Sequence, residues 1–181
     1  MNALDEIRDM AKKKGVLRER AREIGVKIGE IDVKKRLPEV GLHSLNNLWN
    51  PFATQILNAA HLLLLQVDDT WLKQGLQKLE KEGQTVDLRE DNISDLCNFS
   101  SQTDQEELLP VFTAKLKGEM SYSTFVKRFN ELRDTFEREI EDVERECSPI
   151  RAAGLEMSAE IVRIDQQLKA IADAAASAIS G

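Results

Sequence analysis

The segment 157–179, MSAEIVRIDQQLKAIADAAASAI, decides the fold because its apolar residues recur at steps of three and four. This spacing places side chains on one face of an α-helix. The face is formed by Met157, Ile161, Ile164, Leu168, Ile171, Ala175 and Ala178. A helix gains most of its stability by packing such a face against another element, so the segment predicts a packing partner.

The same pattern continues backwards along the chain to Tyr122 and is broken only at Arg133 and Gly154. A second segment near the N-terminus has equal spacing, and seven of its eight positions are apolar. Those positions are Ile7, Met10, Lys14, Leu17, Ala21, Ile24, Ile28 and Ile31. An average repeat of about 3.5 residues is typical of helices that wind around each other in a left-handed coiled coil.

We therefore predict an all-α fold in which the N-terminal and C-terminal helices form a long antiparallel coiled coil joined to a central helical head. At ~1.5 Å per residue the helix over 3–37 and the segment 150–178 have similar lengths, roughly 50 and 43 Å. The alternative is that each apolar face packs separately in a compact bundle. The contact surface of the coiled coil, called the seam, is expected to include Leu17, Ile24, Ile28, Ile161, Ile164 and Leu168.

Three segments are expected along the chain. The N-terminal coiled-coil helix covers 1–37, the central helical head covers 38–119 with a polar loop at 84–102, and the long C-terminal helix covers 120–181. Ser148 and Pro149 interrupt the last segment without changing the phase of its pattern. This predicts a bend near residues 148–149, after which the helix continues.

Prolines suggest where the first helices begin and end. Pro38 should end the first helix, because proline lacks an amide donor and disfavours the helical conformation of the residue before it. Asn50 followed by Pro51 is typical of a helix start, so a second helix should run from there towards Gly83.

The later helix starts are predicted from hydroxyl residues. Segment 84–102 should form an irregular loop with one short helix. Thr103 and Glu106 have the spacing of a capping box that would start the next helix. Ser121 or Ser123 should cap the long C-terminal helix.

Charge and composition narrow the class of protein. The composition of 31% charged and 5% aromatic residues favours long helices. The net charge of −7 argues against nucleic acid as a partner, because phosphate binding requires clustered cations. The start of the chain lacks a signal-peptide pattern, and the apolar run 59–67 is too short to span a bilayer. Two cysteines without metal or redox spacing suggest reduced thiols, so a cytoplasmic location and no membrane partner are expected.

No residue pattern points to catalysis, so we expect no enzyme activity, no cofactor and no metal. His61 lies in an apolar run and should be a core or core-edge residue. His43 follows Glu39 by four residues, but Pro38 and Gly41 argue against a helix that would bring these two side chains together. Cys97 has no histidine nearby in sequence to activate it. The acidic run containing Glu137, Glu141 and Glu144 lacks the histidine motif of a di-iron bundle and should be a solvated helix flank.

Segment 112–133 resembles a helix-turn-helix in its small residues and basic pair, and it supports an alternative function in DNA binding. The residues that would contact DNA are Ser123, Thr124, Lys127 and Arg128. One residue too many lies between Gly118 and the serine-rich turn, and the residues that follow are acidic. An ordinary loop and helix cap is the simpler interpretation.

The combined pattern predicts a non-enzymatic interaction or assembly protein, such as an adaptor or inhibitor, that contacts another protein and forms a homo-oligomer. Partner contacts are expected on the polar loop, because rigid helices often present functional loops. The residues expected there are Asp87, Arg89, Asp91 and Phe99. A second alternative is an α-helical toxin subunit that exposes the apolar run 59–67 at a membrane.

Overall fold

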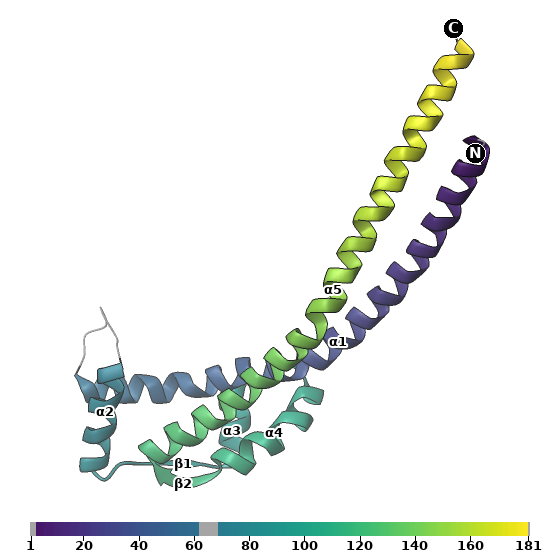
Figure 1. The fold of residues 1–181 in the computed structure, drawn as a ribbon. Coiled ribbons are helices and arrows are strands. Elements are labelled where there is room, and N and C mark those ends of the chain that lie inside the picture. Colours follow the sequence, from purple (N-terminus) through teal and green to yellow (C-terminus); the bar gives the residue numbers. More distant parts are fainter. Residues whose placement is uncertain (1–2, 62–68, 181) are drawn as a thin grey trace. The chain divides into compact units, whose positions relative to one another are not determined.

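The computed structural model describes residues 3–61 and 69–180 and confirms the predicted all-α class (Figure 1). The elements in chain order are α1 (Ala3–Ala60), α2 (Asp69–Lys81), β1 (Thr85–Leu88), α3 (Glu90–Cys97), α4 (Gln102–Leu116), β2 (Gly118–Ser121) and α5 (Tyr122–Ser180). The chain forms two compact units. The core unit contains residues 35–141, and the two-helix unit contains residues 1–34 with 142–181.

The prediction that Pro38 ends the first helix is wrong, as is the prediction that a new helix starts at Pro51, because α1 runs through both prolines. A proline inside a helix costs ~3 kcal/mol or more. The helix beyond Pro38 buries large apolar side chains, including Leu45, Leu48 and Ile56, which are all 0% exposed. Each such side chain contributes about 1.5–3 kcal/mol, so packing in the core outweighs the local penalty.

The helix predicted from Pro51 towards Gly83 is two separate helices, because α1 ends at Ala60 and α2 begins at Asp69. Gly83 does follow the end of α2, and its φ of +70° suits glycine. The amides of Gly83 and Gln84 donate to the carbonyls of Glu80 and Leu79. These bonds satisfy carbonyls at the end of α2 and turn the chain towards β1.

The segment predicted as an irregular loop contains a short strand as well as the expected short helix. β1 pairs with β2 in antiparallel register, with Val86 opposite Met120 and Leu88 opposite Gly118. Val86, Leu88 and Met120 are buried, while Asp87 and Glu119 are exposed. Four residues are too few for alternation to distinguish a strand from a turn in the sequence.

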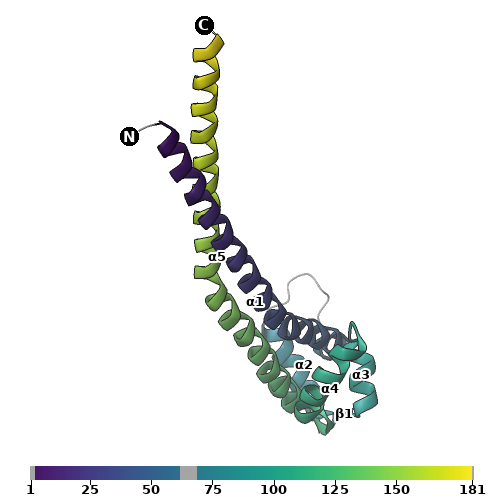
Figure 2. The ribbon, with the colours of Figure 1, turned by 90° about the vertical axis from the view of Figure 1, so that its right-hand side faces the viewer.

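The centre of the core unit is an aromatic cluster between α1 and α5. The Trp49 ring lies 4.8 Å from the Phe129 ring, and the Phe52 ring lies 4.5 Å from the Phe125 ring, measured between centroids. Such contacts stabilise a core beyond the area that they bury. α3 and α4 contact each other in the same unit (Figure 2).

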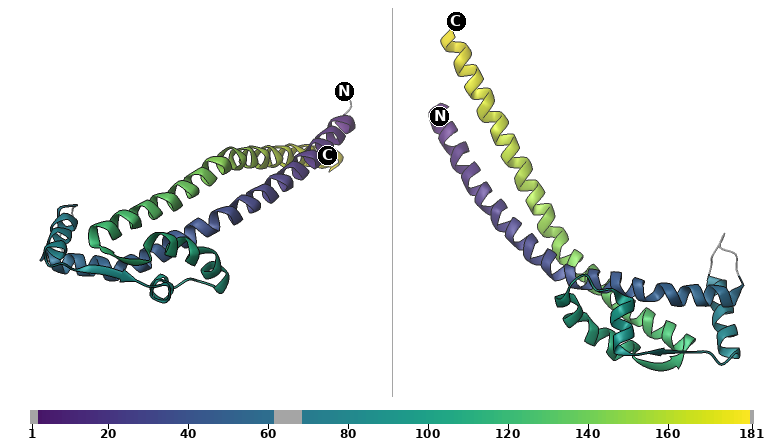
Figure 3. Two further views of the ribbon diagram at one scale, coloured as in Figure 1. Left: turned by 90° about the horizontal axis from the view of Figure 1, so that it is seen from below. Right: turned by 180° about the vertical axis from the view of Figure 1, so that it is seen from behind.

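In the two-helix unit the arms of α1 and α5 run side by side in opposite directions, as predicted (Figure 3). Lys14 forms an ion pair with Asp165, and Lys34 forms one with Glu146 at 3.7 Å. Partner numbers in α5 fall as those in α1 rise, which is the register of an antiparallel pair. A Cβ added to Gly154 would lie 3.1 Å from Ile24 Cγ2, so these helices are in close contact.

The predicted seam is the least exposed face of both arms. Ile164 is 2% exposed and Ile31 is 4% exposed. The other predicted seam residues are half-buried, namely Leu17, Ile24, Ile28, Ile161 and Leu168. α5 continues through Pro149 as predicted, and the bend near residues 148–149 stays a prediction. Ser121 Oγ accepts the amide of Thr124, which confirms Ser121 as a helix cap.

The substitution Gly75→Ala should destabilise the core unit. A Cβ at position 75 would lie 2.3 Å from the carbonyl oxygen of Ile56, and this backbone atom cannot rotate away. We expect a loss of about 1–3 kcal/mol in the free energy of unfolding, measured by urea denaturation. The exposed Gln77 of the same helix is the control, and Gln77→Ala should change stability by less than about 0.5 kcal/mol. Equal stability of the two variants would contradict this packing.

Candidate protein-binding groove

Helix α3 is held in place by two buried side chains and a left-handed residue at its end. Ile93 and Cys97 are both 0% exposed and face the core. Asn98 follows the helix with φ 49° and ψ 58°, a conformation that asparagine tolerates better than most residues. Its amide donates to the carbonyl of Ser94. The chain therefore turns directly from α3 into the segment that starts α4.

Helix α4 begins two residues earlier than its predicted capping box. Ser101 is the N-cap, and its Oγ accepts the amide of Asp104 at 3.1 Å and donates to the Asp104 carboxylate at 2.7 Å. The predicted pair Thr103 and Glu106 does not form the cap, and both side chains are exposed. The sequence allows two caps at the same spacing, Ser101 with Asp104 and Thr103 with Glu106. The first cap forms because Asp104 is buried.

Asp104 is the only charged side chain that the structure buries completely among the described residues. Arg36 Nη2 donates to Asp104 Oδ1 at 2.6 Å, which connects the start of α4 to α1. A buried carboxylate requires such charge-assisted bonds to offset its desolvation. The interaction fixes the start of α4, which forms one side of the surface described next.

A groove runs between α3 and α4, here called the α3–α4 groove, and it includes a hollow of about 590 Å³. Phe99 lines this hollow, with its ring centroid 5.7 Å from that of the buried Phe112. Leu109, Glu90 and Gln105 line this hollow and also the hollow next to it. The full lining is Arg89, Glu90, Asp91, Ser94, Asp95, Phe99, Ser101, Gln102, Gln105, Glu106, Leu109, Pro110, Thr113 and Lys117.

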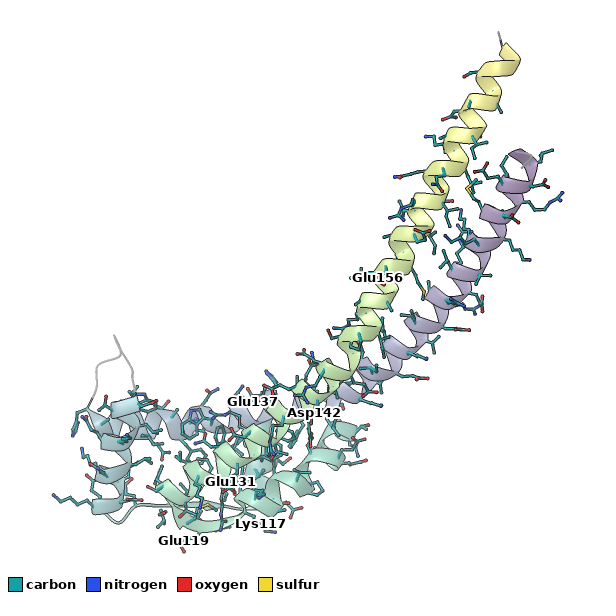
Figure 4. All side chains as sticks on the ribbon, in the orientation of Figure 1. Lys117, Glu119, Glu131, Glu137, Asp142 and Glu156 are labelled. Carbon is teal, nitrogen blue, oxygen red and sulfur yellow. The ribbon has the colours of Figure 1, made fainter. Side chains whose placement is uncertain are left out.

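The groove combines an apolar floor with a mainly acidic rim. Phe99 and Leu109 are half-buried, whereas Pro110 is exposed. Exposed carboxylates outnumber the cations along the rim. The acidic residues are Glu90, Asp91, Asp95 and Glu106, and the basic residues are Arg89 and Lys117. Lys117, labelled in Figure 4, pairs with Glu90 at 3.2 Å, so one cation is already neutralised within the groove.

Three of the four residues predicted to contact a partner line this groove: Arg89, Asp91 and Phe99. Asp87 lies outside the lining, exposed on β1. Most of the remaining lining comes from α4, which the sequence placed in the helical head without a role. Leu109 and Pro110 are apolar but lie outside the regular apolar spacing that forms the buried face of α4. Such an apolar pair on the exposed side of a helix could have indicated the groove from the sequence.

The residues of the possible DNA-binding segment are not arranged as a helix-turn-helix. Gly118–Ser121 forms the strand β2, and α5 follows it directly, so no tight turn separates two helices. Ser123 and Thr124 are half-buried. Lys127 and Arg128 are exposed, and Arg128 Nη1 donates to the carbonyl of Lys115 at 3.4 Å.

The groups considered for catalysis or metal binding are dispersed. His43 is exposed on α1, and His61 is exposed at its end, so the prediction that His61 is a core or core-edge residue is wrong. The Lys78 ammonium contacts the His61 ring. Within residues 3–61 and 69–180, no cluster of three His, Cys, Asp or Glu side chains is placed to hold a metal ion. Glu137, Glu141 and Glu144 are exposed, as expected for a helix flank.

Most of the apolar run 59–67 lies outside the described residues, so the structure does not describe the region proposed for a toxin. In the part of the chain that is described, no helix combines the length and apolar character needed to cross a bilayer.

Comparison of the chain with protein-family models, with curated proteins and with solved structures gives no match. The function must therefore be inferred from the chemistry of the described surfaces.

The thiol of Cys97 should be unreactive in the folded protein. Burial raises the pKa of Cys97 from 9.0 to about 12, because the thiolate would lose its hydration. In a Cys147→Ser variant, we expect Ellman's reagent at pH 8 to modify Cys97 at least ~100-fold more slowly in buffer than in denaturing urea. The same shift should lower stability as the pH rises above 9, because only the unfolded chain ionises there. Rapid modification of the folded variant would contradict the burial of α3.

Replacement of Asp104 should destabilise the core unit, because Asp104→Ala removes the bonds to Arg36 and to Ser101. We expect a loss of about 2–4 kcal/mol in the free energy of unfolding. The exposed Glu107 on the same helix is the control, and Glu107→Ala should change stability by less than about 0.5 kcal/mol. Urea denaturation followed by circular dichroism measures both. A loss no larger than that of the control would mean that this buried carboxylate does not hold α4.

Proposed function

We propose that this chain is a non-enzymatic interaction protein, an adaptor or an inhibitor, that binds a segment of another protein in the α3–α4 groove and associates with itself. The observation that supports this function is the combination of Phe99, Leu109 and Pro110 inside a rim of four carboxylates. Half-buried apolar side chains offer anchoring contacts, and the charged rim offers orientation and specificity. The groove is held in place by the ion pair between the exposed Arg36 and the buried Asp104 and by the aromatic contact of Phe99 with Phe112.

The chemistry of the groove defines the partner segment. Four acidic residues face two basic ones, and one of the basic residues is already paired with Glu90. A partner with Lys or Arg beside apolar residues would meet opposite charge along the rim and fill the apolar floor. An amphipathic helix with a basic flank has this composition and commonly binds in grooves between helices. Each exposed charge contact should contribute only ~0.2–1 kcal/mol, so the apolar anchors must supply most of the affinity.

A fluorescein-labelled peptide of lysine and leucine, 14 residues long and with one apolar helical face, tests this proposal by fluorescence anisotropy. We expect micromolar binding to the full chain. The double variant Asp95→Lys/Glu106→Lys should bind about tenfold more weakly, a change of about 1.4 kcal/mol. Binding should also weaken as salt is raised from 0.1 to 0.5 M, because the rim charges are exposed.

Glu107 provides the matched control, since it follows Glu106 on α4 and is also exposed but lies outside the groove lining. The variant Glu107→Lys should bind the peptide as the wild type does. A peptide with glutamate in place of lysine should not bind. Equal weakening by the double variant and by Glu107→Lys would show non-specific charge attraction and would refute the groove as the binding site.

A further inference from the structure

A second groove lies within the two-helix unit, between the arms of α1 and α5. Its volume is about 440 Å³, and its lining is largely apolar or small. The lining residues are Ala21, Ile24, Gly25, Ile28, Arg151, Gly154, Leu155 and Ser158. Ile24 and Ile28 belong to the seam, so the groove exposes one side of the contact that holds the two arms together.

Large apolar side chains extend this groove along the same side of the unit. Leu155 is 73% exposed, and Val162 is 55% exposed. Seven residues correspond to nearly two helical turns, so Val162 lies on the same side of α5 as Leu155. An apolar groove that is extended by large exposed apolar side chains is a common mark of a protein interface.

The opposite side of the two-helix unit is charged. Glu156, labelled on α5 in Figure 4, is exposed, and so is Arg163 one residue after Val162. On α1, Glu23, Lys27, Glu30 and Lys34 follow one another at steps of three or four and are all exposed. The groove side is also charged in places, since Arg151 of the lining pairs with Asp32 at 3.0 Å, but it differs from the opposite side by the large exposed side chains of Leu155 and Val162.

Glycines on α1 lie level with the exposed apolar residues on α5. Gly25 lines the groove with Leu155. Lys13 and Lys14 form ion pairs with Glu160 and Asp165, and Val162 lies between these two partners in sequence. Gly15, which follows Lys14, is therefore level with Val162. A Cβ added at Gly15 or Gly25 would meet no atom within 4 Å, so nothing within the described chain fills these positions.

We infer that the groove is covered by a second copy of this chain. The two copies are related by a twofold axis parallel to the helices, so that α1 of one copy faces α5 of the other. Such an axis keeps each residue at its own level. Leu155 of one copy then packs over Gly25 of the other, and Val162 lies at the level of Gly15. The result is a four-helix bundle in which every neighbouring pair of helices is antiparallel.

Charge selects this partner and this axis. The arm of α1 over 3–34 carries nine basic and seven acidic residues, a net charge of +2, and the arm of α5 over 142–180 carries four basic and seven acidic residues, a net charge of −3. An axis parallel to the helices places the positive arm of one copy against the negative arm of the other. An axis perpendicular to them would place α1 against α1 and α5 against α5, which brings like charges together.

The available surface is large enough for a stable dimer. About 30 residues of each arm span roughly 45 Å, and two adjacent helices are about 20 Å wide. Face-to-face packing would bury about 900 Å² on each copy, or about 1,800 Å² in total. Specific protein interfaces bury about 1,200–2,000 Å².

Light scattering coupled to size-exclusion chromatography of the full chain tests the inference. The wild type should elute with twice the chain mass of 20.5 kDa at about 20 µM. Val162→Glu places a charge in the proposed interface and should give a monomer. Val16→Glu is the matched control, because Val16 is 50% exposed on α1 but lies nine residues from Gly25, which is half a turn away on the opposite side. This variant should stay dimeric, and circular dichroism should show equal helix content in all three proteins.

The direction of the axis is tested by a spin label on an Asp173→Cys variant, since Asp173 is exposed whereas Cys97 and Cys147 are buried. In the proposed dimer the two labels lie at the same end, about 20–30 Å apart. With a perpendicular axis near Leu155 they would lie about 54 Å apart, because 18 residues of helix separate each label from that axis.

A monomeric wild type, or equal dissociation by Val162→Glu and Val16→Glu, would overturn the inference. A dimer with the long label distance would overturn the axis. The inference specifies the self-association part of the proposed function and does not involve the α3–α4 groove. Failure of the dimer with retained peptide binding would therefore leave the proposed groove function standing, and the reverse result would leave the dimer standing.

Discussion

The antiparallel pairing of α1 with α5 is the contact on which both units depend. In the two-helix unit the pairing is aliphatic, with Ile164 buried and Ile24 against Gly154. In the core unit it is aromatic, with Trp49 against Phe129 and Phe52 against Phe125. The first and last helices of the chain, α1 and α5, therefore pack against each other in both units. All other described elements lie between them in sequence and belong to the core unit.

The two proposed binding surfaces differ in chemistry because they lie on differently packed elements. The α3–α4 groove has a mainly acidic rim and a small apolar floor, which suits a single segment of a partner protein. The groove of the two-helix unit has a largely aliphatic and glycine lining with one charged residue, Arg151, and is flanked by arms of opposite net charge. That combination suits a second copy, which presents the same two arms.

The glycines of α1 have different physical roles in the two units. Gly41 lies against the Phe136 ring, where a Cβ would be 2.7 Å from the ring atom Cζ, so a larger residue would disturb the core. Gly15 and Gly25 have open space around them, and each costs the isolated helix up to ~1 kcal/mol relative to alanine. Nothing within the described chain compensates for this cost, whereas a helix that approaches closely from a second copy would.

The sequence by itself determined the helical class, the antiparallel partners and the seam residues, because a repeat maintained over many turns states which face must be buried. It also singled out Arg89, Asp91 and Phe99, which line the α3–α4 groove. Tertiary structure decided that α1 continues through Pro38 and Pro51, because burial of the residues that follow outweighs a local penalty. It also decided the pairing of β1 with β2, the cap at Ser101 and the contribution of α4 to the groove, since each of these depends on contacts between residues far apart in the chain.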